Sequence, residues 1–295
     1  MTAAALTTSR IDAVTLAAIT ITVFGWASAF PAIGAALAGG FGPLELGALR
    51  FGIAAIPGAL LLLLTRPALP HWREAWRFAF GGLVFVALYT ALLNIGQQTV
   101  PAGAASFIIN VNPILTAALA MLLLGERFGR MAWLGTAISF AGVGLIALGK
   151  ADSLALDTGA LFILGAALCT ALTSIVQKPL FSRHRPLTVA SVNMIVGALA
   201  LAPFLPAGIA QAQTAGIGAL AAALYLAIVP SFIVYGTWAI TLSRLPAARA
   251  TNFLYCVPPL ATVMGFVWLG EMPNTLGLIG GALALGGVVL VNLRR

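Results

Sequence analysis

The stretch LLLGERFGR, residues 122–130, ends a long apolar run with Gly125 and Glu126, and the chain repeats this ending 145 residues later. The stretch VWLGEMPN, residues 267–274, has Gly270 and Glu271 at the equivalent positions but no arginine after them. The same offset aligns residues 101–146 with residues 246–291 without a gap, matching Pro101/Pro246, Pro113/Pro258, Gly135/Gly280 and Gly142/Gly287. The matched prolines and glutamates predict that the chain contains two copies of one unit.

Composition indicates the broad class of protein. The chain has 295 residues, of which 61% are hydrophobic and 7% charged, and its mean hydropathy is +1.06. A soluble domain of this length carries far more charge on its surface, whereas a chain dissolved in lipid does not. The sequence therefore predicts a polytopic membrane protein.

Apolar runs of about 20 residues, the length that spans a bilayer, are separated by prolines, glycines and charge clusters. They predict ten spans, at residues 13–36, 44–64, 77–97, 102–124, 131–149, 158–177, 187–205, 216–237, 247–269 and 275–292. The runs do not alternate in polarity as the strands of a β-barrel would. We therefore predict an all-α integral membrane protein with ten transmembrane helices.

The distribution of basic residues predicts the orientation, because short cytoplasmic loops carry an excess of Lys and Arg. If both termini are cytoplasmic, thirteen of the fifteen basic residues lie on the cytoplasmic side: Arg10, Arg66, Arg73, Arg77, Arg127, Arg130, Lys178, Arg183, Arg185, Arg244, Arg249, Arg294 and Arg295. Lys150 would lie outside, and Arg50 lies within the second span. The basic residues lie singly or in small groups between apolar runs. The net charge of +8 is therefore interpreted as a signal for membrane orientation and not as a nucleic-acid-binding surface.

The number of spans in each copy predicts how the copies are related. Five spans are an odd number, so the second copy enters the membrane from the opposite side, a construction common among secondary transporters. The loops agree, because QQTVPAG is uncharged where its equivalent LSRLPAAR has two arginines. We predict two inverted five-helix repeats, residues 1–150 and 151–295. Glu126 and Glu271 would then mark one structural position on opposite membrane faces, where a role in helix-end packing is favoured over chemistry.

Polar and aromatic residues inside the spans predict a central cavity. They concentrate in spans one, three, four, six, eight and nine, whereas the Gly-rich spans five and ten have almost none and should pack closely together. Many recur four residues apart, on one face of a helix. The predicted lining residues are Trp26, Phe30, Tyr89, Asn94, Asn110, Ser174, Lys178, Tyr235, Trp238 and Tyr255. Each of them could instead only pack, or join helices by hydrogen bonds.

Two further groups of residues bear on the cavity. Prolines at 31, 113, 179, 230, 258 and 259 lie within or near the ends of these helices, where they remove backbone donors and act as hinges or as fixed kinks. Arg50 could attract a carboxylate, or extend outward toward Glu45 and the interface, and we favour the outward direction. Lys178 could meet a carboxylate in the cavity or extend to the cytoplasm.

Missing residue types narrow the function. No Asp or Glu lies near the middle of a span, so a proton-coupled exporter of cations is disfavoured and a neutral or zwitterionic substrate is favoured. Both histidines lie in predicted cytoplasmic loops and no hydrolase motif is present, so we expect no enzyme. Cys169 and Cys256 lie inside apolar runs and read as small core residues, and no metal or cofactor is expected.

The WASAFP stretch (26–31) and the pattern P…NP…LLLGE (101–126), echoed by P…PP…WLGE (246–271), resemble the drug/metabolite transporter superfamily, in particular its EamA-type exporters. Within that group the chain looks most like the bacterial YddG amino-acid exporters. The resemblance implies outward movement of aromatic and other neutral amino acids across the inner membrane.

These observations together predict a secondary transporter of the bacterial inner membrane. It would export neutral or aromatic amino acids and related metabolites by alternating access, as a facilitator and as a monomer, with small-molecule substrates and membrane lipid as its partners. The alternatives are a carrier of sugar-phosphates or nucleotide-sugars, which needs several deep basic residues, and a membrane scaffold, which needs no polar cavity.

Overall fold

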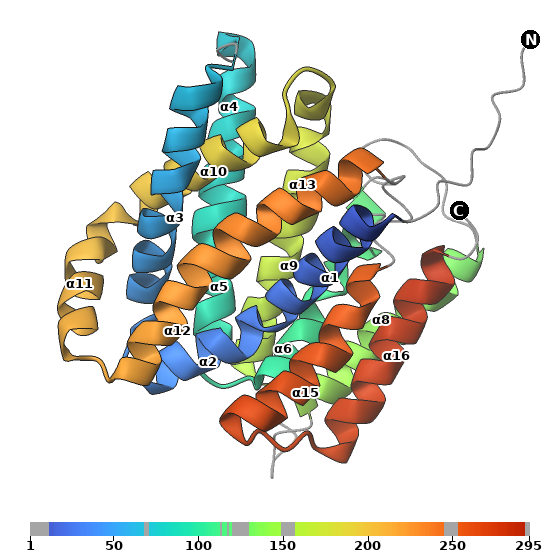
Figure 1. The fold of residues 1–295 in the computed structure, drawn as a ribbon. Coiled ribbons are helices and arrows are strands. Elements are labelled where there is room, and N and C mark those ends of the chain that lie inside the picture. The colour runs from blue at the N-terminus through green and yellow to red at the C-terminus, as the bar shows by residue number, and fades with distance from the viewer. Residues whose placement is uncertain are drawn as a thin grey trace, which may run out of the picture.

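The computed structural model describes residues 12–67, 71–112, 114–116, 118–119, 130–148, 157–244 and 253–292. All regular structure within these residues is helical, and no strand is found among them. The helices form one bundle in which most run between two opposite ends (Figure 1). Glu126 and the residues around it lie outside the described residues, as do Thr251 and Asn252.

The first half of the chain contributes α1 (Ala13–Ala27), α2 (Ala29–Ala38), α3 (Pro43–Thr65), α4 (Trp72–Phe80), η1 (Gly81–Leu88), α5 (Tyr89–Gly96), α6 (Ala102–Ile109) and α8 (Arg130–Leu148). The second half contributes α9 (Thr158–Gln177), η2 (Lys178–Ser182), α10 (Pro186–Leu201), η3 (Ala202–Phe204), α11 (Leu205–Thr214), α12 (Ile217–Ile228), η4 (Val229–Ile233), α13 (Val234–Arg244), η5 (Phe253–Cys256), α15 (Val257–Leu269) and α16 (Thr275–Asn292).

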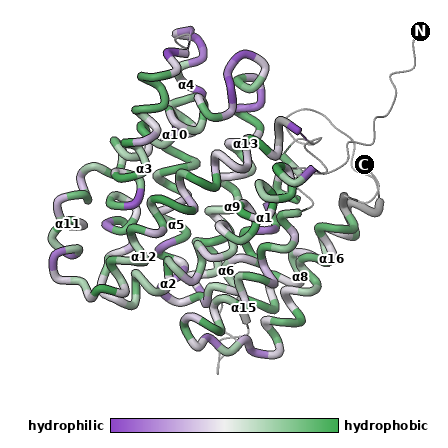
Figure 2. Tube along the Cα trace, viewed as in Figure 1, coloured by the Kyte–Doolittle hydropathy of each residue, from purple (hydrophilic) through white to green (hydrophobic). Residues whose placement is uncertain are grey.

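Six helical stretches are long and apolar enough to cross a membrane: Ala13–Ala38, Pro43–Thr65, Trp72–Gly96, Thr158–Ser182, Pro186–Thr214 and Ile217–Trp238. Four shorter apolar helices, Ala102–Thr116, Trp133–Ile146, Phe253–Leu269 and Thr275–Leu290, fall within predicted spans four, five, nine and ten. Hydrophilic residues gather at the loops at the ends of the bundle (Figure 2). The chain is thus a helical, multi-pass membrane protein, and the count of ten spans stays a prediction.

Two helices extend beyond the predicted spans. The helix that contains the third predicted span begins at Trp72, five residues before residue 77, because His71 caps α4 by accepting a hydrogen bond from the Arg73 backbone N–H. The helix of the seventh span continues through η3 and α11 to Thr214, beyond residue 205. Pro203 does not stop it, because it lies in the first turn of a 3₁₀ segment, where a backbone donor is not needed.

The helices α8 and α16 pack against each other through backbone contacts that only glycine permits. A Cβ atom at Gly142 would lie closer than 3.0 Å to the Gly280 carbonyl oxygen, and one at Gly287 would lie equally close to the Gly135 carbonyl oxygen. Ser139 Oγ, between the two contacts, donates a hydrogen bond of 3.0 Å to the Ala284 carbonyl. The prediction that the Gly-rich fifth and tenth spans pack closely is confirmed.

Helical irregularities accompany the prolines of the central helices. The break between α1 and α2 at Ser28 lies three residues before Pro31, which has no N–H to donate to the Ala27 carbonyl. Pro230 lies in the π-helical η4, and Pro179 lies in the 3₁₀ segment η2 that follows α9. Breaks at these prolines are as predicted. Pro113 lies outside the described residues, but α6 ends at Ile109, four residues before it.

The two π-helical segments are related by the same offset as the repeated sequence stretches. The offset of 145 residues maps residues 84–88 of η1 onto residues 229–233, the whole of η4. Segments of π-helix are rare and are often found at functional sites, because the wider turn re-aims the side chains around it. Phe85 lies within η1, and Tyr235 follows η4 by two residues.

Candidate functional site

Trp26 of α1 lies between two aromatic side chains of α13. Its ring centroid is 6.2 Å from that of Tyr235, in an edge-to-face arrangement at 87°, and 5.4 Å from that of Trp238. Tyr235 and Trp238 are three residues apart and share one face of α13. Three of the ten predicted lining residues therefore meet at one place.

Phe85 connects this group to the third predicted span. Its ring lies 6.4 Å from that of Tyr235 and 5.7 Å from that of Tyr89, at the start of α5. The aromatic cluster, defined here as Trp26, Phe85, Tyr89, Tyr235 and Trp238, is therefore continuous from α1 across α13 to η1 and α5. All five side chains are half-buried, so part of each remains accessible. Phe85 was not predicted.

Arg50 lies beside this cluster, and its predicted outward direction is wrong. The side chain is 8% exposed and its Nε donates a 2.7 Å hydrogen bond to Ser231 Oγ in η4. Its guanidinium lies over the Phe51 ring, 5.0 Å from the centroid, and Phe51 packs in one hydrophobic cluster with Phe85 and Tyr235. The side chain does not extend toward Glu45, because the Ser231 hydroxyl and the Phe51 ring offer it favourable contacts inside the bundle.

Two of the other predicted residues contact the helix framework. Asn94 is buried, and its Nδ2 donates a hydrogen bond of 2.8 Å to the Pro43 carbonyl at the start of α3. Phe30 is buried in the main hydrophobic core, and its carbonyl accepts a hydrogen bond of 3.0 Å from Gln97 Nε2. These contacts agree with the alternative interpretation of Asn94 and Phe30, in which they only pack or join helices by hydrogen bonds.

Asn110 and Tyr255 lie in helical turns and are half-buried. Asn110 Nδ2 donates a hydrogen bond of 2.9 Å to the Ser106 carbonyl of its own helix, and Tyr255 lies in η5 against the main core. Cys169 is buried, whereas Cys256, next to Tyr255, is exposed. The prediction of a core position is therefore wrong for Cys256.

Ser174 and Lys178 are exposed, although they lie on an inward face of α9. Ile163 and Ala167 share that face and are fully buried at 0% exposure. The face is thus covered near the start of α9, which is its predicted outer end, and accessible near its predicted cytoplasmic end. Ser174 Oγ donates a hydrogen bond of 2.8 Å to the Thr170 carbonyl.

Polar contacts join α1 to α13 between the aromatic cluster and the predicted cytoplasmic end. The Thr22 and Thr237 hydroxyls lie 2.9 Å apart, and Arg244 Nη1 forms a 2.8 Å ion pair with Asp12. Hydrogen bonds from Thr15, and then the charge of Arg244, hold the pKa of Asp12 below its usual range. Trp26 and Trp238 therefore belong to helices that are held together along their length.

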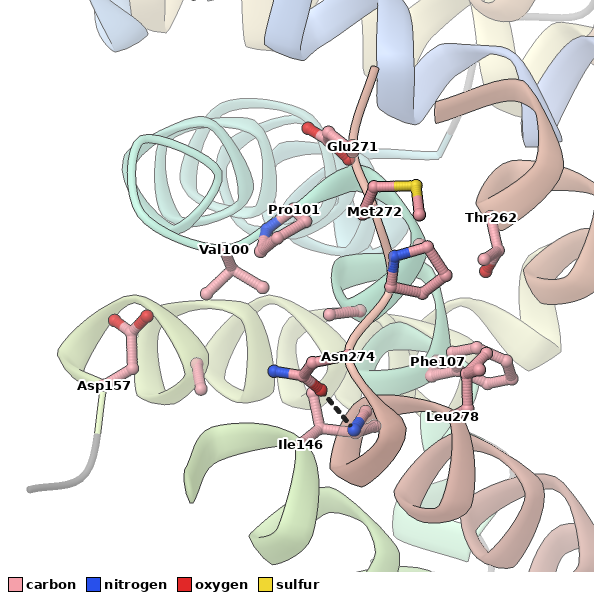
Figure 3. A pocket seen from close by; sticks show the side chains of 15 residues that line it. Val100, Pro101, Phe107, Ile146, Asp157, Thr262, Glu271, Met272, Asn274 and Leu278 are labelled. Carbon is pink, nitrogen blue, oxygen red and sulfur yellow. Dashed lines mark hydrogen bonds between the residues drawn. The ribbon is translucent and has the colours of Figure 1, made fainter. Parts of the chain in front are cut away.

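A separate cavity of about 170 Å³ lies at the predicted outer end, between α6, α15 and α16. Figure 3 shows Pro101, Glu271, Met272 and Asn274 around it, with the Asn274 side chain accepting a hydrogen bond from the Gly277 backbone. None of the ten predicted lining residues is among the described residues that form its wall. This cavity and the aromatic cluster are therefore different places.

Glu271 borders this cavity and caps a helix. Its Oε2 accepts a hydrogen bond of 2.8 Å from the Ala102 backbone N–H, the first residue of α6. A carboxylate at this position satisfies an unpaired donor and complements the positive end of the helix dipole. The prediction of a helix-end role for Glu271 is confirmed, although the helix it caps is α6 and not its own.

We expect Glu271→Ala to destabilise the protein by about 1 kcal/mol, the typical cost of a lost N-terminal cap. Glu271→Gln retains an acceptor oxygen but loses the charge, so its loss should be smaller. Thermal unfolding of the detergent-solubilised variants measures both. Equal stability of Glu271→Ala and the wild type would show that the cap contributes nothing.

The comparison with family models decides the kind of protein. The model described as the EamA-like transporter family matches residues 14–148 and, a second time, residues 157–293. The chain belongs to the EamA-like transporter family. The resemblance to EamA-type exporters is confirmed, and family membership makes the chain a transporter and not an enzyme.

Individual EamA relatives agree with this assignment. A protein of Streptantibioticus cattleyicolor named a probable terminal-alkyne amino-acid exporter is 38% identical over 277 residues, covering 94% of this chain and 93% of that protein. The uncharacterized transporter YdfC of Bacillus subtilis is 35% identical, covering 91% of this chain and 88% of its own. A protein of known crystal structure that is 22% identical to this chain, covering 94% of this chain and 99% of that one, shares its fold with a TM-score of 0.59.

Proposed function

We propose that this EamA-family protein exports neutral and aromatic amino acids across the bacterial inner membrane, and that the aromatic cluster binds the substrate side chain. The observation that carries the proposal is the cluster itself: five half-buried aromatic residues from α1, η1, α5 and α13 converge inside the bundle. Aromatic walls with a few polar groups suit a ligand with an apolar side chain and a polar head. The relative named an amino-acid exporter supports this substrate class.

The proposed architecture is two inverted five-helix repeats, residues 1–150 and 151–295, with both termini in the cytoplasm. Separate family matches to the two halves support the division. The contacts of α8 with α16 support the inversion, because the 145-residue offset maps the Gly142–Gly280 contact onto the Gly287–Gly135 contact. Such a pair of contacts is what a twofold axis lying in the membrane plane produces.

The proposed mechanism is alternating access, with the substrate moving down its own gradient. The helix irregularities at Ser28, η1 and η4 lie around the aromatic cluster and supply places where the helices could bend. The face of α9 that carries Ser174 and Lys178 is accessible at the predicted cytoplasmic end, where it would form the entry. Asn110 and Tyr255 remain proposed lining residues, and the monomeric state remains a prediction.

Efflux from proteoliposomes tests the function. Vesicles containing the purified protein and preloaded with labelled phenylalanine or threonine should release the label faster than protein-free vesicles. A sugar-phosphate provides the comparison with the other carrier class, and its release should not be accelerated. Equal release of both amino acids from protein-containing and empty vesicles would contradict the proposal, and selective release of the sugar-phosphate would favour the other class.

A further inference from the structure

We propose that Arg50 binds the carboxylate of the transported substrate. The inference rests on the proposed function, and it adds the residue that recognises the polar head. It limits the substrates to molecules in which a carboxylate stands close to an apolar side chain.

The position of Arg50 is costly for a charge. Arg50 is the one buried basic residue among those that the structure describes. No carboxylate in the described part of the chain forms an ion pair with it, whereas Arg183 and Arg244 pair with Glu74 and Asp12. A charge inside a membrane bundle is energetically costly unless it is paired or has a function. A substrate carboxylate that pairs with the guanidinium would explain why a charged residue occupies this position.

The arrangement of the guanidinium leaves donors for a ligand. Nε is engaged by Ser231, and the Phe51 ring covers the guanidinium. Within the described residues no hydrogen bond forms at either Nη atom. Two Nη groups on one planar guanidinium can donate to the two oxygens of a carboxylate, a geometry that an ammonium group does not offer.

The surroundings of Arg50 fit the rest of an amino acid. Ser231, which binds Arg50, lies one helical turn before Tyr235, and the Phe51 ring under the guanidinium packs in one hydrophobic cluster with Phe85 and Tyr235. Phe85 and Tyr235 both belong to the aromatic cluster. A carboxylate held at Arg50 would therefore leave the substrate side chain against these rings. The substrate ammonium group could lie over an aromatic face, where the ring quadrupole attracts a cation.

A ligand series on the wild-type protein tests the proposal without any variant. Phenylalanine and 3-phenylpropionate carry the carboxylate, whereas phenylalaninamide and phenethylamine lack it. The two carboxylates should raise the thermal unfolding temperature of the solubilised protein and quench the fluorescence of Trp26 and Trp238, and the two amines should do neither. Equal effects of phenylalanine and phenylalaninamide would overturn the proposal.

Substitution of Arg50 provides the second test. We expect Arg50→Gln to raise the KM for phenylalanine efflux by about tenfold or more, the range for a lost hydrogen bond to a charged group, and to abolish the preference for phenylalanine over phenylalaninamide. Arg50→Lys should restore only part of the affinity, because it keeps the charge but not the paired donors. Arg73→Gln, which removes an exposed positive charge from α4, is the matched control and should behave as the wild type.

The outcomes separate this inference from the proposed function. If the wild type moves phenylalanine and Arg50→Gln moves it with an unchanged KM, the role of Arg50 is refuted and the amino-acid carrier stands. If the wild type neither binds nor moves any of the four ligands and does not accelerate threonine release, both proposals fail. If Arg50→Gln does not fold, the wild-type ligand series alone decides.

Discussion

Replacing Gly142 with leucine is expected to destabilise the folded protein strongly, whereas the same change at Gly144 is expected to be tolerated. A Cβ at Gly142 meets the backbone of Gly280 and Ala284, which cannot rotate away, while one at Gly144 has no atom within 4 Å. The two helices would have to separate, at a cost of about 3 kcal/mol for overpacking and lost contact. Size-exclusion profiles and thermal unfolding in detergent measure the effect.

The second half of the chain contains a matching pair of positions. A Cβ at Gly287 would meet the backbone of Gly135 and Ser139, whereas one at Gly286 would have no atom within 4 Å. Leucine at Gly287 should therefore repeat the defect of the Gly142 variant, and leucine at Gly286 should not. Monodisperse, wild-type-like profiles for both the Gly142 and Gly287 variants would contradict the close packing of α8 and α16.

Trp238→Ala is expected to lower phenylalanine efflux by about tenfold or more. The indole packs on Trp26 at 5.4 Å between ring centroids, and losing one aromatic wall removes on the order of 1.5–3 kcal/mol of apolar and aromatic contact. Each 1.4 kcal/mol corresponds to about a factor of ten in affinity. Threonine efflux should fall less, because its side chain buries little aromatic surface. Initial rates in proteoliposomes, normalised to the amount of inserted protein, measure both.

Trp72→Ala is the matched control for the tryptophan variant. Trp72 is 74% exposed and lies at the start of α4, where an interfacial tryptophan belongs. The Trp72→Ala substitution should leave the rates of phenylalanine and threonine efflux near those of the wild type. An unchanged phenylalanine rate in Trp238→Ala, or an equal loss in both variants, would remove Trp238 from the proposed binding site.

Much of the fold could be predicted from the sequence because lipid imposes simple requirements. Apolar length located the helices, and the Gly-rich composition of the fifth and tenth spans predicted the close contact of α8 with α16. The helix ends were less predictable where local capping decided them. His71 begins α4 earlier than the apolar run, and a 3₁₀ turn at Pro203 carries the seventh helix onward.

The aromatic cluster was predictable in part. Trp26, Tyr89, Tyr235 and Trp238 drew attention because they lie deep in their spans and near polar residues. Phe85 did not, because its own turn is apolar and its position depends on the π-helical η1. The four-residue spacing of Phe85 and Tyr89 was a signal that could have revealed it.

Arg50 shows where reasoning from sequence reached its limit. The expectation that a basic side chain extends to the nearest water considers only its own helix. The partner that directs it inward, Ser231, is 181 residues away in the chain and is presented by a π-helical turn. The charge inside a predicted span marked Arg50 as a candidate, but only the three-dimensional structure shows in which direction its side chain points.

Counterflow in proteoliposomes tests the central claim, an alternating-access carrier of neutral amino acids, most directly. Vesicles are loaded with a large excess of unlabelled phenylalanine and diluted into a trace of labelled phenylalanine outside. A carrier that exposes one site alternately to each side should accumulate the label transiently above its external concentration, and Trp238→Ala should weaken this accumulation. Label that only equilibrates would contradict alternating access, and label that does not enter would contradict amino-acid transport itself.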